Sequence, residues 1–219
     1  MIGRPAQLVV VVGTATEIGK TWVTCELVRR LRTPGVLVSA RKPAQSLDPS
    51  AGPSSLATDA DVLADASGEP VERVCPLHRW YDTPMAPPMA AESLGRPRFT
   101  SDDLLTELTW PTGVHVGFVE TAGGVCSPFA DDVDSAEFAR LVDPDHTILV
   151  ADAGLGTISA VRLAVRALAP LDTVVFLNRF DATDELHRRN RDWLTERDCY
   201  ETYTDIAELT THLATAGKQ

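Results

Sequence analysis

The 219-residue sequence predicts a single α/β domain, spanning 1–219, in which a parallel sheet carries helices on both faces. Three observations lead to this fold class. Short apolar, β-branched runs alternate with helical patterns five times along the chain. The runs are apolar throughout, which is typical of strands that are buried on both faces. No repeat or linker divides the chain, and its length suits one domain.

The first part of the chain contains two predicted strands. The run at 7–12 is a strand, and the apolar spacing after it predicts a helix from about 19 to 32. A second strand covers 36–40, and Pro43 stops regular structure soon after it. The segment 44–57 has no periodicity, and we expect a long functional or mobile loop there.

The middle of the chain is predicted to contain short helices around a proline-rich region. Thr58 is a candidate N-cap for a helix at 59–66, and a proline-broken region follows to about residue 88. A further helical segment covers 89–94. Another covers 101–108, where Thr100 or Ser101 is the candidate cap and acidic residues occupy the first turn.

The second half returns to alternating strands and helices. Strands are predicted at 115–120, 147–151 and 173–177, with a weak one near 200–203. Helices are predicted at 134–142 and 156–168, with two more in the tail. The basic stretch 187–191 lies among acidic residues and reads as a solvated helix face.

Composition excludes several classes of protein. The net charge of −11 argues against a sequence-independent nucleic-acid binder, because phosphate contacts need clustered Lys and Arg. No apolar run approaches the roughly 18 residues that span a bilayer, so we expect no membrane contact and a cytoplasmic location. The four cysteines (Cys25, Cys75, Cys126 and Cys199) lack metal-ligand spacing, and we expect them to be buried.

The most specific motif is the segment 13–21, Gly-Thr-Ala-Thr-Glu-Ile-Gly-Lys-Thr. A predicted strand precedes it and a helix follows, which is the context of a phosphate-binding P-loop and predicts a P-loop NTPase-like fold. Backbone N–H groups and the helix N-terminus attract an anion there. Lys20 can reach the β- and γ-phosphates, and the Thr21 hydroxyl can ligate Mg²⁺. The residues that we expect to bind nucleotide here are Thr14, Glu17, Ile18, Gly19, Lys20 and Thr21.

Further candidates follow the ends of the other strands. In a parallel sheet these ends share one edge, and ligands bind outside it. Lys42 follows the second strand and is a cation suited to charge that develops during phosphoryl transfer. Glu120 ends a central strand and can hold Mg²⁺, and Asn178 ends the fifth strand. Asp59 and Asp61 lie in the first turn of the predicted helix at 59–66, where the helix dipole stabilises acidic residues.

These motifs resemble those of the dethiobiotin synthetase family. The likeness extends from about residue 8 to about residue 178. It rests on the P-loop, on Lys-Pro-Ala-Gln-Ser at 42–46, on Asp-Ala at 59–60, on Glu-Thr-Ala-Gly-Gly at 120–124 and on Leu-Gly-Thr-Ile at 155–158. Two further segments, 84–91 and 95–97, match in order and spacing.

The resemblance implies an ATP-dependent ligase of biotin synthesis. In this reaction 7,8-diaminononanoate takes up CO₂ as a carbamate, ATP phosphorylates the carbamate, and the second amine closes a cyclic urea. The family also implies Mg²⁺ as cofactor and a homodimer whose site is shared between subunits.

The same resemblance implies a role for each candidate residue. The catalytic residues would be Lys42, Lys20 and Thr16, and Asn178 would add to the nucleotide contacts. Substrate would be bound by Ser46, Gly123, Leu155 and Gly156. The metal would be bound by Thr21, Asp59 and Glu120, with Asp61 as the rival of Asp59.

Five positions depart from the family pattern, namely Ala15, Leu47, Thr121, Ser159 and Ala160. They leave open a ligase for a different amine, or a nucleotide-binding regulatory protein without ligase activity. A partition-type ATPase would carry a lysine in place of Ala15, and a cobyrinic-acid-type ligase usually carries a glutaminase domain for which this chain has no room. Nucleotide base preference is also open, since the family's later adenine contact is not recognisable near 200–206.

Overall fold

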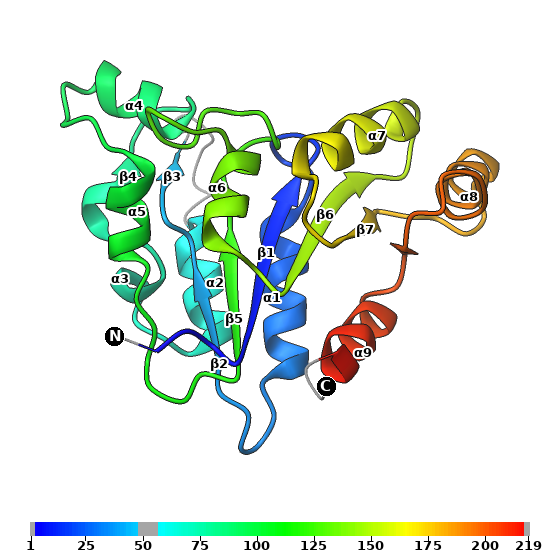
Figure 1. Cartoon of the computed structure of the whole chain (residues 1–219), viewed down its shortest axis with the longest axis horizontal. Helices are drawn as coiled ribbons and strands as arrows, with labels where there is room; N and C mark the ends of the chain where they lie inside the picture. The colour runs from blue at the N-terminus through cyan, green and yellow to red at the C-terminus, as the bar shows by residue number, and fades with distance from the viewer. Residues whose placement is uncertain (1–2, 48–56, 217–219) are drawn as a thin grey trace.

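The computed structural model describes residues 3–47 and 57–216 (Figure 1). Its strands are β1 (Gln7–Gly13), β2 (Val38–Arg41), β3 (Gln45–Ser46), β4 (Trp80–Tyr81), β5 (Val116–Glu120), β6 (His146–Asp152), β7 (Thr173–Asn178) and β8 (Thr202–Tyr203). Its α-helices are α1 (Lys20–Leu31), α2 (Asp59–Ser67), α3 (Val71–Val74), α4 (Pro87–Ser93), α5 (Ser101–Glu107), α6 (Ser135–Val142), α7 (Thr157–Leu168), α8 (Glu185–Asp192) and α9 (Ile206–Ala216). A 3-10 helix, η2, covers Leu77–Arg79 and a π-helical turn, η3, covers Trp193–Arg197.

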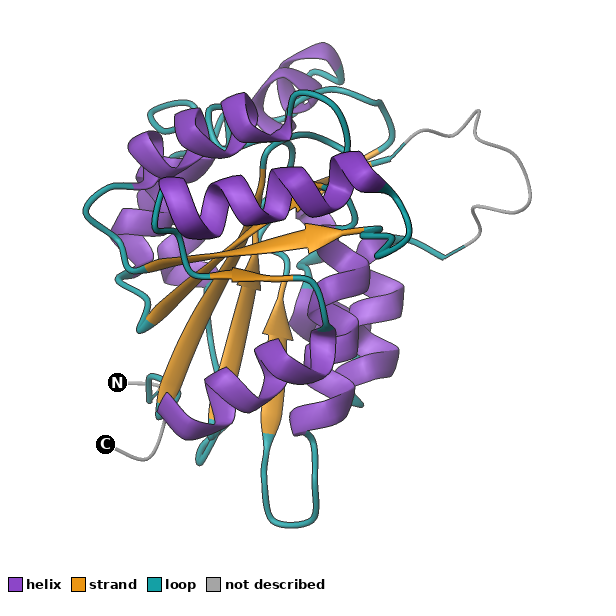
Figure 2. Ribbon diagram, turned by 90° about the vertical axis from the view of Figure 1, so that its right-hand side faces the viewer, coloured by secondary structure: helices purple, strands orange, loops and turns teal. Residues whose placement is uncertain are grey.

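Six strands form one parallel sheet in the order β2-β5-β1-β6-β7-β8 (Figure 2). The predicted fold class is therefore confirmed, and the weak sixth strand pairs with β7. Register sets the ends of neighbouring strands side by side, since Val11 of β1 pairs with Glu120 and Asp152 of β6 pairs with Asn178. The candidate residues that follow these strands share one edge, as parallel pairing requires.

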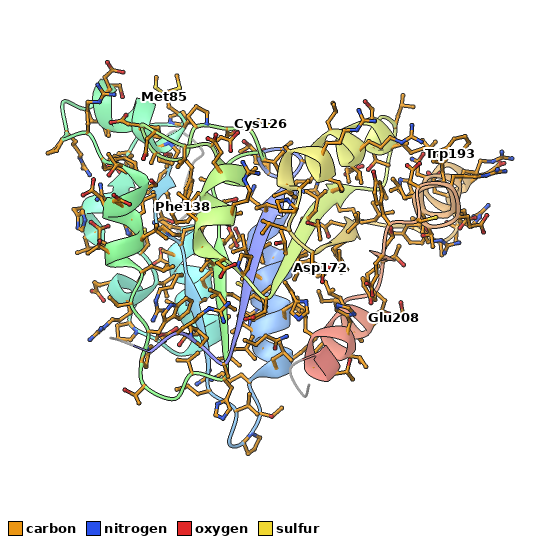
Figure 3. The ribbon with its side chains drawn as sticks, viewed as in Figure 1. Met85, Cys126, Phe138, Asp172, Trp193 and Glu208 are labelled. Carbon is orange, nitrogen blue, oxygen red and sulfur yellow. The ribbon has the colours of Figure 1, made fainter. Side chains whose placement is uncertain are left out.

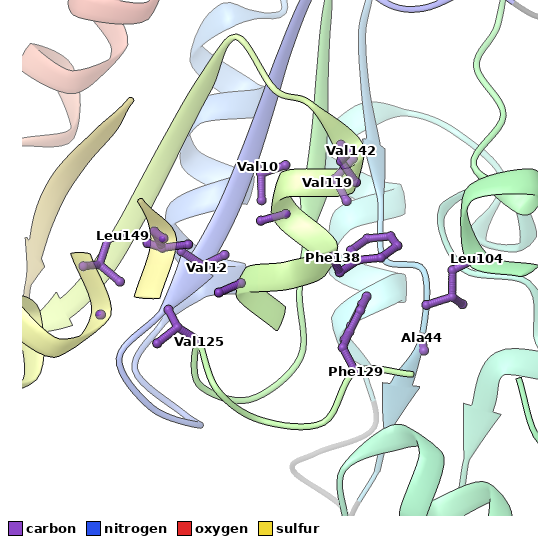
Figure 4. Packing of buried hydrophobic residues seen from close by; sticks show 14 of the residues in the cluster. Val10, Val12, Ala44, Leu104, Val119, Val125, Phe129, Phe138, Val142 and Leu149 are labelled. Atoms are coloured by element: carbon purple, nitrogen blue, oxygen red, sulfur yellow. The ribbon is translucent and has the colours of Figure 1, made fainter. Parts of the chain in front are cut away.

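Strand β1 explains why the sheet is covered on both faces. Its side chains alternate between two buried clusters because successive residues of a strand point to opposite faces. Val10 and Val12 join the cluster that contains residues of α6 and α7, part of which Figure 4 shows. Val9 and Val11 join the cluster that contains residues of α1, α2 and α9. The four consecutive valines thus supply both halves of the core.

Several predicted segments differ from the structure. The predicted proline-broken region up to about residue 88 contains α3, η2, β4 and the start of α4. Strand β2 begins at Val38 rather than at residue 36, because the Leu37 N–H donates to the His115 ring (3.0 Å) and does not join the sheet ladder. The predicted loop at 44–57 contains β3, which pairs with β4 in a separate two-stranded sheet. The rest of that loop, 48–56, lies outside the described residues.

Helix caps follow the prediction closely. Thr58 and Thr100 each accept a hydrogen bond from the backbone three residues on, and Asp61 and Asp103 return a bond to the cap backbone. These reciprocal pairs satisfy two N–H groups that the helix itself cannot. Asp61 is therefore engaged in capping α2.

The cysteine prediction is half wrong. Cys25 and Cys75 are buried, but Cys126 and Cys199 are exposed. Cys126 lies at the upper edge of the molecule (Figure 3), in the loop after β5, and Cys199 has a positive φ in the turn before β8. Both stand in connections between elements, which usually run over the surface. In the part of the chain that the structure describes, no helix is long and apolar enough to cross a bilayer.

Candidate active site

Two features fix the conformation of the P-loop, namely its own backbone angles and a hydrogen bond from the end of β7. Glu17 and Gly19 have positive φ angles of 57° and 96°, which turn the chain into α1. The Asn178 Nδ2 donates to the Ile18 carbonyl (2.9 Å). A Cβ on Gly19 would lie 2.1 Å from that nitrogen, so only glycine fits here. Asn178 thus braces the loop, and its predicted contact with the nucleotide stays a prediction.

The Lys20 side chain reaches from α1 to the loop after β5. Its Nζ donates to the Gly123 carbonyl (2.7 Å) and to the Ala15 carbonyl (3.1 Å). Burial lowers the pKa of Lys20 to about 8, and the positive charge of Lys42 adds to this effect, while Glu120 and Asp59 oppose it. Lys20 is therefore a cation with weak solvation, which suits it to bind an incoming phosphate.

Glu120 gathers three donors at the end of β5. Its Oε1 accepts hydrogen bonds from Lys42 Nζ (2.6 Å) and from the Thr21 hydroxyl (2.7 Å). Its Oε2 accepts one from the Thr24 hydroxyl (2.9 Å). The carboxylate is fully buried, and a buried charge of this kind is tolerated only when it is paired and hydrogen-bonded.

Lys42 also joins Glu120 to Asp59. Its Nζ lies 2.8 Å from Asp59 Oδ2, and its side chain is only 3% exposed. Burial opposes the charge on Lys42, but the charges of Asp59 and Glu120 outweigh it and hold the pKa of Lys42 above its ordinary value. In turn, the Lys42 ammonium holds the pKa of the Asp59 carboxyl below its usual range, against the effect of burial. Lys42 and Asp59 are therefore both charged at neutral pH.

The predicted metal ligands Thr21, Asp59 and Glu120 therefore come together. A hydroxyl and two carboxylates are hard oxygen donors, and Mg²⁺ binds such groups together with water and substrate phosphates. The donor set fits this metal. Within residues 3–47 and 57–216 no three His, Cys, Asp or Glu side chains form a metal cluster by themselves, so a purely protein-held metal is not indicated.

Substitution of Asp59 and of Asp61 in turn tests which of the two carboxylates is the metal ligand. We expect Asp59→Asn to weaken Mg²⁺–nucleotide binding by about tenfold or more. Even the loss of a residue that only orients a metal ligand typically lowers metal affinity by about 10- to 100-fold. Asp61→Asn is the control, since Asp61 caps α2 and should affect helix stability instead. Titration calorimetry with Mg²⁺ and a non-hydrolysable ATP analogue measures both, and equal losses would contradict the assignment of Asp59.

The reacting end of the site has a less complete set of contacts. Thr16 is exposed in the P-loop, and its hydroxyl would lie 3.9 Å from a Cβ built on Gly123. Gly123 has a positive φ of 69° and sits against Ser127, whose hydroxyl accepts from the Gly124 N–H (2.9 Å). Ser46 lies in β3, four residues beyond Lys42. Thr16 and Gly123 are brought together, and Ser46 lies beyond Lys42 on the same segment.

Leu155 and Gly156 are placed differently. They precede α7 after β6, the strand beside β1, and Leu155 is 92% exposed. They line a surface hollow of about 500 Å³ along α7, with Ser159 and Arg162. They do not join the Lys42 cluster through any hydrogen bond or ion pair of the described residues. Their predicted role in substrate binding stays a prediction.

Sequence reasoning missed two groups that shape the site. Thr24 has no motif of its own, and only its position one turn after Lys20, on the face of α1 that meets β5, places it on Glu120. Arg179 has a positive φ of 57°, and its guanidinium donates to the Glu17 carbonyl (3.1 Å), which braces the P-loop from the end of β7.

Comparison with known families agrees with this geometry. A family model described as an AAA domain matches residues 7–178. The chain is 36% identical to the ATP-dependent dethiobiotin synthetase BioD of Caulobacter sp. (strain K31), over 80% of this chain and 77% of that protein. It is 35% identical to the BioD of Anaeromyxobacter dehalogenans (strain 2CP-C), over 80% of this chain and 78% of that protein.

Solved structures support the fold. A protein described as a plasmid partition protein from Borrelia burgdorferi B31, bound to AMPPNP, matches with a TM-score of 0.56 and 11% identity, over 97% of this chain and 98% of that one. The chloroplast FtsY of Physcomitrella patens matches with a TM-score of 0.52 and 16% identity, over 100% of this chain and 67% of that one. At such identities the likeness concerns the fold alone.

Proposed function

The chain belongs to the dethiobiotin synthetase family, and on this premise we propose that it is an ATP-dependent carbon–nitrogen ligase that closes the cyclic urea of dethiobiotin. The observation that carries the proposal is the cluster of Lys42, Glu120, Asp59 and Thr21 beside the P-loop. A protein that only binds nucleotide does not require a second buried cation, such as Lys42, beside its phosphate loop.

The proposed reaction has three steps. One amine of 7,8-diaminononanoate adds to CO₂, loses a proton and gives a carbamate. A carbamate oxygen attacks the γ-phosphorus of ATP, and ADP leaves with the bonding pair, which yields a carbamic–phosphoric anhydride. The second amine then attacks the carbonyl carbon and releases inorganic phosphate as the ring closes.

Lys20 and Lys42 stabilise negative charge on different groups during the proposed reaction. Lys20 neutralises the β- and γ-phosphates, since its low solvation makes exchange of carbonyl partners for phosphate oxygens favourable. Lys42, which is paired with Glu120 beside the P-loop, stabilises charge as the phosphoryl group moves onto the carbamate. Thr16 and Gly123 line the same end of the pocket.

Mg²⁺ would be held by Thr21, Asp59 and Glu120. When bound, it acts as a Lewis acid that draws electron density from the phosphate oxygens. We also propose a homodimer, as the family resemblance implies, in which the exposed Leu155 and Gly156 of one copy contact the substrate bound by the other. The cytoplasm, where ATP and bicarbonate are present, is the proposed location.

Phosphate release tests this proposal. We expect release from MgATP that requires both 7,8-diaminononanoate and bicarbonate, measured with each omitted in turn. Release with bicarbonate and a different diamine, but not with this one, would transfer the proposal to another amine. Tight nucleotide binding without amine-dependent release would instead favour the regulatory module, and the five departures from the family pattern would then mark its lost substrate site.

A further inference from the structure

The Glu120 carboxylate has two oxygens with separate surroundings. Oε1 faces Lys42 and Thr21. Thr21 is also one of the proposed metal ligands. Oε2 accepts a hydrogen bond from Thr24 Oγ1 (2.9 Å). A carboxylate can rotate about its last side-chain bond, so the orientation of Oε1 depends on what holds Oε2.

Thr24 is a donor with little choice of geometry. It is fully buried in α1, and its hydroxyl lies 2.9 Å from both the Lys20 carbonyl and Glu120 Oε2. One hydroxyl proton cannot serve both acceptors fully, and the Thr24 hydroxyl lies within hydrogen-bond distance of each of them. The Lys20 carbonyl restricts the rotation of the hydroxyl and keeps it near Glu120.

The hydroxyl also ties two segments of the site together. Thr24 lies one turn after Lys20 and Thr21 on α1, while Glu120 ends β5. Residues Thr21 and Thr24 stand three apart on the helix, and both donate to the same carboxylate. The bond therefore fixes Glu120 relative to the first turn of the helix that binds phosphate.

We propose that Thr24 is a positioning residue that holds Glu120 Oε2 so that Oε1 is presented to the metal and to Lys42. This inference rests on the proposed metal site at Glu120 for its effect on metal binding, and on the proposed reaction only for its consequence in turnover. Outer-shell donors of this kind fix the orientation of a metal ligand, and their loss typically costs about 10- to 100-fold in metal affinity or activity.

Two substitutions separate the hydroxyl from the rest of the side chain. Thr24→Val keeps the branched shape and removes the donor, whereas Thr24→Ser keeps the donor and removes a methyl group. We expect Thr24→Val to weaken Mn²⁺ binding in the presence of ADP by about tenfold or more. Thr24→Ser should retain most of the wild-type affinity. Electron paramagnetic resonance of free Mn²⁺ measures both without any turnover.

Thr147 provides a matched control. It is buried in β6, away from the site, and its hydroxyl has no hydrogen-bond partner in the part of the chain that the structure describes. Thr147→Val makes the same chemical change and should leave Mn²⁺ affinity as it is. If Thr24→Val does not fold, Thr24→Ala takes its place in the comparison with Thr24→Ser, because it also lacks the donor.

The outcomes are distinct. Equal Mn²⁺ affinity in the Val, Ser and wild-type proteins would overturn the role of Thr24. A loss in Thr24→Ser as large as in Thr24→Val would also overturn it, because packing and not the hydroxyl would then matter. In a third outcome, the wild-type protein makes no dethiobiotin while Mn²⁺ affinity still falls only in Thr24→Val. That result would contradict the proposed reaction and leave the positioning role intact. In turnover, Thr24→Val should raise the Mg²⁺ concentration needed for half-maximal rate more than it lowers kcat.

Discussion

Lys42→Met is expected to abolish measurable ligation while nucleotide binding persists. The substitution removes the cation that joins Glu120 and Asp59, and with it the charge that we propose stabilises the transferred phosphoryl group. Loss of one preorganised donor of this kind costs about 10²- to 10³-fold in kcat. Lys42 lies outside the P-loop segment 13–21, so we expect calorimetric affinity for the nucleotide to change far less. Initial rates of phosphate release at saturating substrates measure the effect.

The same variant should be destabilised in the absence of metal. Glu120 then remains buried without its cation, and removal of one partner of a buried pair costs about 3 kcal/mol or more. Arg41→Met is the matched control, because Arg41 is the preceding residue, is buried, and pairs with Glu69 (3.0 Å) away from the site. It should lower the melting temperature and spare kcat. A Lys42→Met enzyme with the wild-type rate would remove Lys42 from the mechanism.

Gly19→Ala is expected to disable the P-loop. An alanine must adopt the φ of 96°, and its Cβ would lie 2.1 Å from Asn178 Nδ2. The Asn178 bond to Ile18 must therefore break and the loop must move. A displacement of about 1 Å at a reacting group can cost on the order of 100-fold in rate, so kcat/KM for ATP should fall by that order.

Gly35→Ala isolates the cause of this loss. Gly35 also has a positive φ, 85°, but a Cβ there meets no atom within 4 Å among the described residues. Both variants carry the cost of a left-handed alanine, about 1–2 kcal/mol, and should show similar falls in melting temperature. Only Gly19→Ala should lose ATP. Comparable kinetics in the two variants would mean that the Asn178 brace does not hold the loop.

The sequence predicts the main features of this fold because its signals are local. The valines of β1, the P-loop that follows and the caps at Thr58 and Thr100 each depend on neighbours within a few residues. Parallel pairing then brings Lys42 and Glu120 to one edge without further information. Roles within the site are harder, and the roles of all the candidate residues stay predictions.

Contacts between distant segments account for what the sequence did not show. Thr24 meets Glu120 across 96 positions and Asn178 meets Ile18 across 160, and neither pairing leaves a spacing that can be read along the chain. The exposure of Cys126 has a similar origin, because it depends on the loop after β5 turning outward beside Ser127. Strand β3 was missed since two residues are too few for a periodic pattern.

The most direct test of the ligase is to follow a labelled carbon into the product. The protein is incubated with MgATP, 7,8-diaminononanoate and carbon-13 bicarbonate, and the product is identified by mass spectrometry. The proposed reaction predicts dethiobiotin that carries the label in its urea carbonyl, formed with one phosphate per ring. Unlabelled or absent dethiobiotin, with ATP bound and the protein folded, would contradict the proposal that this chain closes the ring.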